Sequence, residues 1–123
     1  VAQTENPIPF DVFLQFVKAT FRCATIRHTA PVSPTVSTVA LCGGAGSSFL
    51  SAAKAARADL FITGDFKYHQ FFEAENQIAI ADIGHYESEQ FTKELFYEIV
   101  TKKFSKFAVR LSAVETNPIT YLF

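Results

Sequence analysis

One stretch of the sequence limits the possible folds more than any other. Gln77–Ile83 is apolar at nearly every position until Asp82. A strand with one face in water alternates apolar and polar residues, and this stretch does not. A strand that is covered on both faces is typical of a parallel sheet with helices on either side. The stretch therefore predicts a layered α/β fold.

Strands and helices alternate along the chain before this stretch. Apolar and β-branched residues, ended by turn residues, predict three further strands at 24–28, 36–42 and 59–63. Apolar residues at helical spacing predict three helices near 10–21, 47–57 and 67–74. This order predicts an α/β fold with a mainly parallel sheet flanked by helices.

After Gln77–Ile83 the pattern predicts one long helix and one more strand. The helix is expected over 88–104, and the strand, which alternates and is therefore half exposed, over 107–113. The inward face of the helix is expected to carry four apolar residues: Phe91, Leu95, Ile99 and Val100.

The length allows one domain. Residues 1–9, with Pro7 and Pro9, are expected to be a lead-in, and residues 10–123 the folded part. The chain opens with Val1 and contains no Met, so we expect it to be part of a longer protein.

Charge and composition exclude several classes of protein. Eleven Lys and Arg against twelve Asp and Glu give a formal net charge of −1, so no specific nucleic-acid partner is indicated. No apolar run approaches the ~20 residues that span a bilayer, so no membrane association is expected. Cys23 and Cys42 are expected to be buried free thiols, which favours a cytoplasmic protein.

Unusual residues follow three of the predicted strands, in the segments 43–48, 64–69 and 84–89. The carboxyl ends of parallel strands lie at one edge of a sheet, where ligands of such folds bind. The three segments should therefore open on one cleft.

The first segment is glycine-rich and precedes a predicted helix. Gly44, Gly46, Ser47 and Ser48 could form a loop for an anion or a substrate, since glycines expose backbone amides. The segment has Phe49 where the dinucleotide motif needs Gly, and it lacks the Lys of the phosphate loop of ATPases. A tight turn with a serine cap is the alternative.

The second segment holds Asp65, Lys67 and His69. Asp65 could orient a neighbouring imidazole, as carboxylates beside metal sites do, or it could cap the helix that follows. His69 could act in a site or be an ordinary surface residue.

The third segment places His85 and Glu89 four residues apart at the start of a helix. This spacing puts both side chains on one helix face, where they could share a metal ion. Imidazole and carboxylate donors suit Zn, Mn, Fe, Co or Ni. A surface His–Glu pair is the alternative. Two ligands do not complete a site, so the others should come from elsewhere.

Taken together, the blocks Val39–Ser48, Asp59–His69 and Asp82–Glu89 resemble one family. The chain is similar to the C-terminal lobe of the NIF-three-like proteins, which are hexamers with a dinuclear metal centre and are often described as GTP cyclohydrolase I type 2. The resemblance covers roughly residues 10 to 123 and implies that an N-terminal lobe lies outside this chain.

The resemblance implies roles for the residues above. His85 and Glu89 would be ligands of two divalent metal ions in the full-length protein, and the other ligands would lie in the N-terminal lobe. Asp65, Lys67 and His69 would line the cleft for proton transfer or substrate contact. The implied function is a metal-dependent hydrolase acting on a nucleotide such as GTP, in a homo-oligomer, with this chain inactive alone. A metal-carrying scaffold without enzymatic activity, or a protein-interaction module, is the alternative.

Overall fold

The computed structural model describes residues 1–122. The chain divides into two compact units, Val1–Ser88 and Glu89–Phe123, and each is described here by itself. The first unit contains the whole sheet and the candidate site residues up to Ser88.

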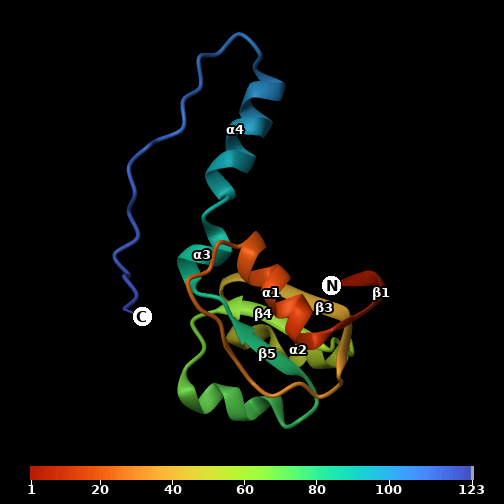
Figure 1. Cartoon of the computed structure of the whole chain (residues 1–123). Helices are drawn as coiled ribbons and strands as arrows, with labels where there is room; N and C mark the ends of the chain where they lie inside the picture. Colours follow the sequence, from red (N-terminus) through yellow and green to blue (C-terminus); the bar gives the residue numbers. More distant parts are fainter. Residues whose placement is uncertain (123) are drawn as a thin grey trace. The chain divides into compact units, whose positions relative to one another are not determined.

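The first unit is built on a five-stranded sheet with the order β1-β3-β4-β5-β2 (Figure 1). The strands are β1 (Ala2–Pro9), β2 (Arg27–His28), β3 (Thr35–Ala45), β4 (Leu60–Gly64) and β5 (Ala79–Asp82). The three central strands are parallel, with Val39 beside Leu60 and Leu60 beside Ala79, and the two edge strands are antiparallel. The prediction of a mainly parallel α/β sheet is confirmed.

Helices cover both faces of this sheet. They are α1 (Phe10–Thr20), the 3-10 helix η1 (Ser47–Phe49), α2 (Leu50–Ala55), the 3-10 helix η2 (Tyr68–Ala74) and α3 (His85–Glu89), which runs into the second unit. One core cluster joins α1 to a sheet face through residues such as Val17 and Leu60, and a second joins α2 and η2 to the other face through Phe61 (Figure 1). All four residues of β5 and all five of β4 are buried, as the unbroken apolar pattern predicts.

Residues 1–9 are not the lead-in that the sequence predicted. They contain the edge strand β1, which pairs with β3 through Ala2–Val39 and Ile8–Val36, with an irregularity between Gln3 and Ile8. Prolines occur in sheets on edge strands, where a missing N–H need not interrupt the ladder. Pro7 and Pro9 therefore did not exclude a strand.

The second unit differs most from the sequence prediction. Helix α4 covers Thr92–Lys103 instead of 88–104, and the predicted strand at 107–113 has no regular secondary structure. A strand needs a neighbour to receive its hydrogen bonds, and none pairs with this segment within residues 1–122.

The predicted inward face of this helix is also wrong for the described chain. No residue of α4 is buried, and Leu95 and Ile99 are 56% and 50% exposed, while Phe91 and Val100 are partly exposed. Within residues 1–122, no helix is long and apolar enough to cross a membrane.

The two cysteines differ in environment. Both are free thiols, but Cys23 is buried and Cys42 is partly exposed, so the prediction of two buried thiols holds for Cys23 only. Burial, and to a smaller extent the nearby Glu87 carboxylate, together raise the pKa of the Cys23 thiol from 9.0 to about 11, against a smaller lowering by Lys18.

We predict that Cys23 is the less reactive thiol by a wide margin. A Cys42→Ser variant, which keeps only Cys23, should react with a disulfide reagent at pH 8 about 100-fold more slowly when folded than when unfolded, because thiolate is scarce and access is blocked. Cys23→Ser is the matched control, in which the partly exposed Cys42 should react readily.

Between pH 9.0 and about 11 only the unfolded chain releases the Cys23 proton, so the unfolding free energy of Cys42→Ser should fall across that range. Equal folded rates for the two variants would contradict the assignment.

Candidate functional site at the carboxyl edge of the sheet

The three segments that follow the parallel strands lie together, and the cleft that the sequence predicted between them stays a prediction. The backbone N–H of Gly44 donates to Ser88 Oγ at 2.7 Å, which joins the end of β3 to α3. Thr63 in β4 donates to the Gly44 carbonyl at 3.2 Å, and Gln70 in η2 donates to Ser47 Oγ at 3.0 Å. Thr63 and Gln70 flank the second segment, and Asp65 within it contacts His85 at 2.7 Å, so hydrogen bonds link all three segments within the first unit.

Asp65 and His85 form the centre of this region. Asp65 Oδ2 lies 2.7 Å from His85 Nδ1, and the two side chains are 52% and 47% exposed. A carboxylate only accepts hydrogen bonds, so Nδ1 carries the proton and donates it. In the neutral ring the lone pair is then on Nε2, which is the tautomer that binds a metal through that atom. His85 does not point into the core.

This contact decides between the two interpretations of Asp65. The residue does not cap η2, because the N-cap position of that helix is Lys67. Asp65 instead has φ of 59° and holds an imidazole, which is the role that the sequence suggested for it. The spacing could not show that the imidazole belongs to His85, which lies 20 residues away.

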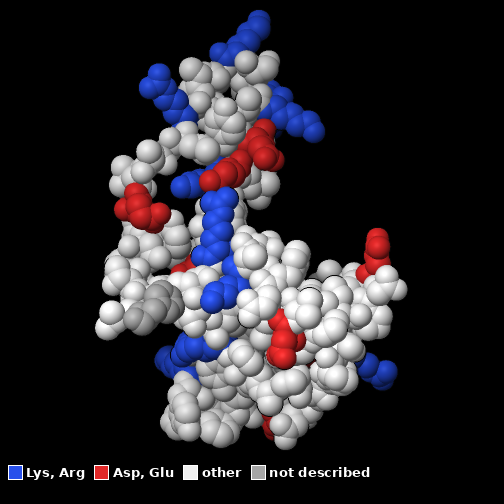
Figure 2. All heavy atoms as spheres, viewed as in Figure 1, with Lys and Arg blue, Asp and Glu red and all other residues white. Residues whose placement is uncertain are grey.

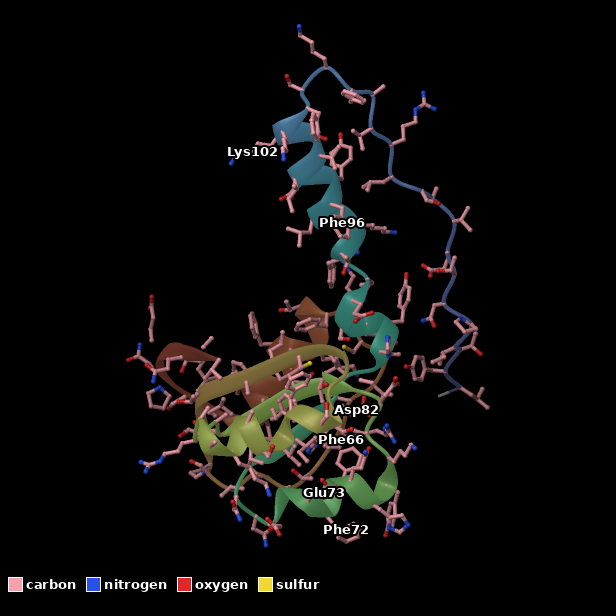
Figure 3. The ribbon with its side chains drawn as sticks, turned by 180° about the vertical axis from the view of Figure 1, so that it is seen from behind. Phe66, Phe72, Glu73, Asp82, Phe96 and Lys102 are labelled. Atoms are coloured by element: carbon pink, nitrogen blue, oxygen red, sulfur yellow. The ribbon has the colours of Figure 1, made fainter. Side chains whose placement is uncertain are left out.

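A buried carboxylate behind the pair holds both segments in place. Asp82, only 4% exposed, ends β5 and accepts hydrogen bonds from the N–H groups of Phe66 at 2.9 Å and Gly84 at 3.0 Å. It also pairs with the Arg27 guanidinium. Each of the two N–H groups is next to one member of the pair, so Asp82 fixes the backbone beside Asp65 and beside His85. Figure 3 shows Asp82 and Phe66 close together in the first unit.

The role of Asp82 and Arg27 was not predicted from the sequence. A signal was present in Asp82 itself, an ionisable residue at the end of an otherwise apolar strand, because buried carboxylates need partners. Arg27 gave no comparable signal, since it lies 55 residues from Asp82 and reaches it through the pairing of β2 with β5.

Two glycines allow the close approach of these segments. Gly84 has φ of +94°, and a Cβ there would lie 2.1 Å from Glu87 Oε2. A Cβ on Gly64 would lie 2.9 Å from the carbonyl of Gly84. The end of β4 can therefore touch the start of α3 only without a side chain at Gly64, and the positive φ of Gly84 favours glycine there as well.

The glycine-rich segment packs onto the protein. The Gly44 amide is bonded to Ser88, and a Cβ on Gly46 would lie 2.2 Å from Thr63 Oγ1. Ser47 accepts from Gln70, and Ser48 is exposed. The anion or substrate loop stays a prediction.

Lys67 and His69 are near the pair in sequence and are both exposed. The His69 ring packs edge-on against Tyr68, with ring centroids 5.2 Å apart. Neither residue takes part in the Asp65–His85 hydrogen bond.

The metal ligands predicted from spacing are both in α3. His85 begins that helix and Glu89 ends it, and residues four apart lie on one face of a helix. Within residues 1–122, no three His, Cys, Asp or Glu side chains are grouped so that they could hold a metal ion. The His85–Glu89 pair stays a prediction, as does the need for further ligands.

We predict that Asp82 is a main support of the first unit. Asp82→Asn keeps the size of the side chain but removes the buried charge that faces Arg27, and it should lower the unfolding free energy by about 2–4 kcal/mol. Glu73→Gln makes the same chemical change at an exposed position and should have little effect. Urea unfolding followed by circular dichroism measures both. An Asp82→Asn protein as stable as the Glu73→Gln protein would contradict this role.

Comparison with known proteins identifies the family of the chain and agrees with its fold. The sequence model of the family Duf34/NIF3 (NGG1p interacting factor 3) matches residues 1–118. A Campylobacter jejuni protein named GTP cyclohydrolase 1 type 2 homolog is 32% identical over 119 residues, which are 95% of this chain and 46% of that protein. A Staphylococcus epidermidis protein of the same name is 31% identical, over 98% of this chain and 34% of its own length. The chain thus spans less than half the length of these relatives.

Solved structures show the same fold. The Staphylococcus aureus protein SA1388 superposes with a TM-score of 0.82 at 24% identity, covering 98% of this chain and 41% of that one. A Bacillus cereus protein related to NIF3 superposes with a TM-score of 0.80 at 25% identity, covering 98% and 35%. From the family match over residues 1–118, we conclude that this chain belongs to the Duf34/NIF3 family.

Proposed function

We propose that this chain is the metal-binding half of a dinuclear-metal protein, and that the whole protein is a metal-dependent hydrolase that acts on a nucleotide. The observation that carries the proposal is the 2.7 Å hydrogen bond between Asp65 Oδ2 and His85 Nδ1. Histidines that bind metals commonly donate their other ring N–H to a carboxylate, which fixes the tautomer and the ring orientation. Both residues follow the end of a central parallel strand, β4 for Asp65 and β5 for His85.

The donor set fits a divalent transition metal in kind but not in number. His85 supplies a ring nitrogen and Glu89 a carboxylate, which suit Zn, Mn, Fe, Co or Ni. Two donors leave most of a coordination sphere open, and the residues described hold no larger cluster. We infer that the remaining ligands are His and Asp side chains of an N-terminal lobe, and that two ions bind in the full-length protein.

A pair of bound divalent ions would supply a water of lowered pKa as the nucleophile. The residues of this chain would orient the metal ligand and take part in proton transfer. Asp65 keeps the proton on Nδ1 of His85, so Nε2 is presented in the form that binds a metal. Asp82 keeps the two backbone segments in register. Lys67 and His69, both exposed and close to Asp65 in the sequence, are the candidates for proton transfer or substrate contact.

The nucleotide is proposed because relatives at 31% and 32% identity bear the name GTP cyclohydrolase 1 type 2 homolog. The Gly44–Ser48 segment is the candidate for contact with its phosphates. The charges in Figure 2 are compatible with a small-molecule substrate, since neither sign covers the visible face as it would on a nucleic-acid binding surface.

One observation favours a second function, in which the protein is a metal-carrying scaffold for other proteins. The second unit exposes large apolar side chains, among them Phe96, Phe107 and Val114 at 60%, 71% and 72%. Aromatic side chains are enriched at interfaces between proteins. The same residues support a homo-oligomer, which we infer to be a cytoplasmic hexamer. A full-length protein that carries its metal and is inert on a panel of nucleotides would favour the scaffold.

We predict that this chain alone binds metal weakly and has no hydrolase activity. Titration calorimetry with Zn²⁺ and Mn²⁺ should show weak binding or none, because affinity depends on the number of preorganised ligands. In the full-length protein His85→Ala should lower affinity at least 10–100-fold, and His28→Ala, outside the candidate set, should leave it unchanged. Tight binding of two ions by this chain would contradict the need for an N-terminal lobe, and an unaffected His85→Ala protein would contradict the site.

Asp65→Asn tests the orienting contact in the same full-length protein. The amide can donate to Nδ1 instead of accepting from it, so the ring should lose its preference for the tautomer protonated at Nδ1. We expect the metal affinity to fall about 10-fold or more. Nitrogen NMR of the His85 ring in the metal-free protein should show the tautomer change directly. An unchanged tautomer and affinity would show that Asp65 does not orient His85.

A further inference from the structure

A cavity next to the candidate site is not used by the proposed metal chemistry. Its volume is about 400 Å³, within the range of sites for small ligands. It lies in the first unit, between η2 and the segment that begins with β2. The lining residues are Arg27, His28, Thr29, Ala30, Tyr68, Phe71 and Phe72.

Aromatic rings form one side of the cavity. Tyr68 and Phe72 are 70% and 65% exposed, and their rings meet edge to face with centroids 5.3 Å apart. Phe71 packs against the buried Phe66 at 5.4 Å, which anchors this side to the core. Figure 3 shows Phe72 on η2, in the same unit as Phe66. Large exposed rings held on a fixed support are suited to stacking with a flat ligand.

Arg27 supplies fixed hydrogen-bond donors to the same cavity. Its Nη2 donates to the Phe66 carbonyl at 2.8 Å and to Asp82, and its guanidinium lies 5.5 Å from the centre of the Phe71 ring. A guanidinium has five N–H groups, and these two bonds use only those of Nη2. The three N–H groups on Nη1 and Nε form no hydrogen bond with residues 1–122.

The charge of Arg27 is already balanced by the buried Asp82 carboxylate. A second anion would therefore gain little from this guanidinium, whereas a neutral ring with acceptor atoms would gain hydrogen bonds. Arginine recognises heterocyclic bases through such acceptors, and guanine presents two of them on one edge. The combination favours a heterocyclic base over a phosphate group.

The cavity is joined to the candidate site through one residue. Phe66 donates its N–H to Asp82 and accepts at its carbonyl from Arg27, and the preceding residue is Asp65, which holds His85. A ligand seated against Arg27 would thus lie beside the segment that orients the proposed metal ligand.

We propose that the cavity between Arg27 and the Tyr68–Phe72 rings binds the heterocyclic base of the nucleotide. The inference rests on the proposed function for the nucleotide, and it assigns the base to residues that the metal site does not use. Binding at this cavity requires no metal ion, so the two proposals can fail separately.

The test is an NMR titration of this chain in the presence of EDTA. Guanosine 5′-monophosphate should shift, in a saturable manner, the Nε–Hε signal of Arg27 and the amide signals of Tyr68 and Phe72. Ribose 5-phosphate, which has the sugar and phosphate but no base, should not. Phe72→Ala and Tyr68→Ala should each weaken binding about tenfold, the loss expected for one stacking ring. Both side chains are exposed, and the amide spectrum shows whether the fold is kept.

Phe16→Ala is the matched control, because Phe16 is also exposed, at 62%, but lies on α1 away from this cavity. Its affinity should equal that of the unchanged chain. No shift at Arg27 at millimolar nucleotide, equal shifts with ribose 5-phosphate, or equal weakening by Phe16→Ala would each overturn the base assignment. None of these results bears on the proposed metal site. If the base binds but His85→Ala leaves the metal affinity of the full-length protein unchanged, the proposed function is refuted and the proposed base site stands.

Discussion

The arrangement at the carboxyl edge of the sheet depends on one buried charge. Asp82 is 4% exposed, and its two carboxylate oxygens together receive the N–H groups of Phe66 and Gly84 and the guanidinium of Arg27. A carboxylate in such a position is stable only when its lone pairs are satisfied. Because these partners come from β2, from the turn after β4 and from the turn after β5, satisfying the charge also fixes three separate pieces of backbone. The exposed side chains of Asp65 and His85 are therefore positioned by the hydrogen bonds of the buried Asp82.

This dependence explains why a polar centre can exist next to an apolar core. β4 and β5 are buried throughout, and the ladder between them places Thr63 beside Asp82 at the last pair of the ladder. Apolar residues form the earlier pairs of the ladder, and polar residues occupy its last pair and the turns that follow. Asp65, with its left-handed backbone, is the first residue beyond β4 and turns its carboxylate toward His85. The position of Asp65 therefore depends on where β4 ends as well as on the type of residue at that point.

The centre of the fold could be predicted from the sequence because its cause is local. Strands without alternation need cover on both faces, so Gln77–Ile83 alone indicated a parallel sheet, and the meeting of the strand ends followed from it. The edges could not be predicted in this way. Whether residues 1–9 pair with β3, or residues 107–113 pair with anything, depends on partners that their own pattern does not specify. Half-exposed patterns are therefore weaker evidence than buried ones.

The candidate site shows the same division. His85, Asp65 and the glycines stand out in the sequence, while Arg27 does not, since one arginine in a polar segment is unremarkable until β2 brings it to β5. The tautomer of His85 likewise requires a contact across 20 residues. The residue types predicted that Asp65 and His85 take part in the site. Only the fold could show that Asp65 contacts His85 and that Arg27 contacts Asp82.

The edge strand β1 has a consequence for how this protein can associate. Two of its eight residues are prolines, and its pairing with β3 is irregular between Gln3 and Ile8. Proline lacks a backbone N–H, so the outer edge of β1 has an incomplete row of hydrogen-bond donors. A strand of another molecule is therefore not expected to pair with β1 in regular register and continue the sheet on this side. An assembly on this side depends on contacts between side chains, and the geometry of those contacts sets its number of subunits.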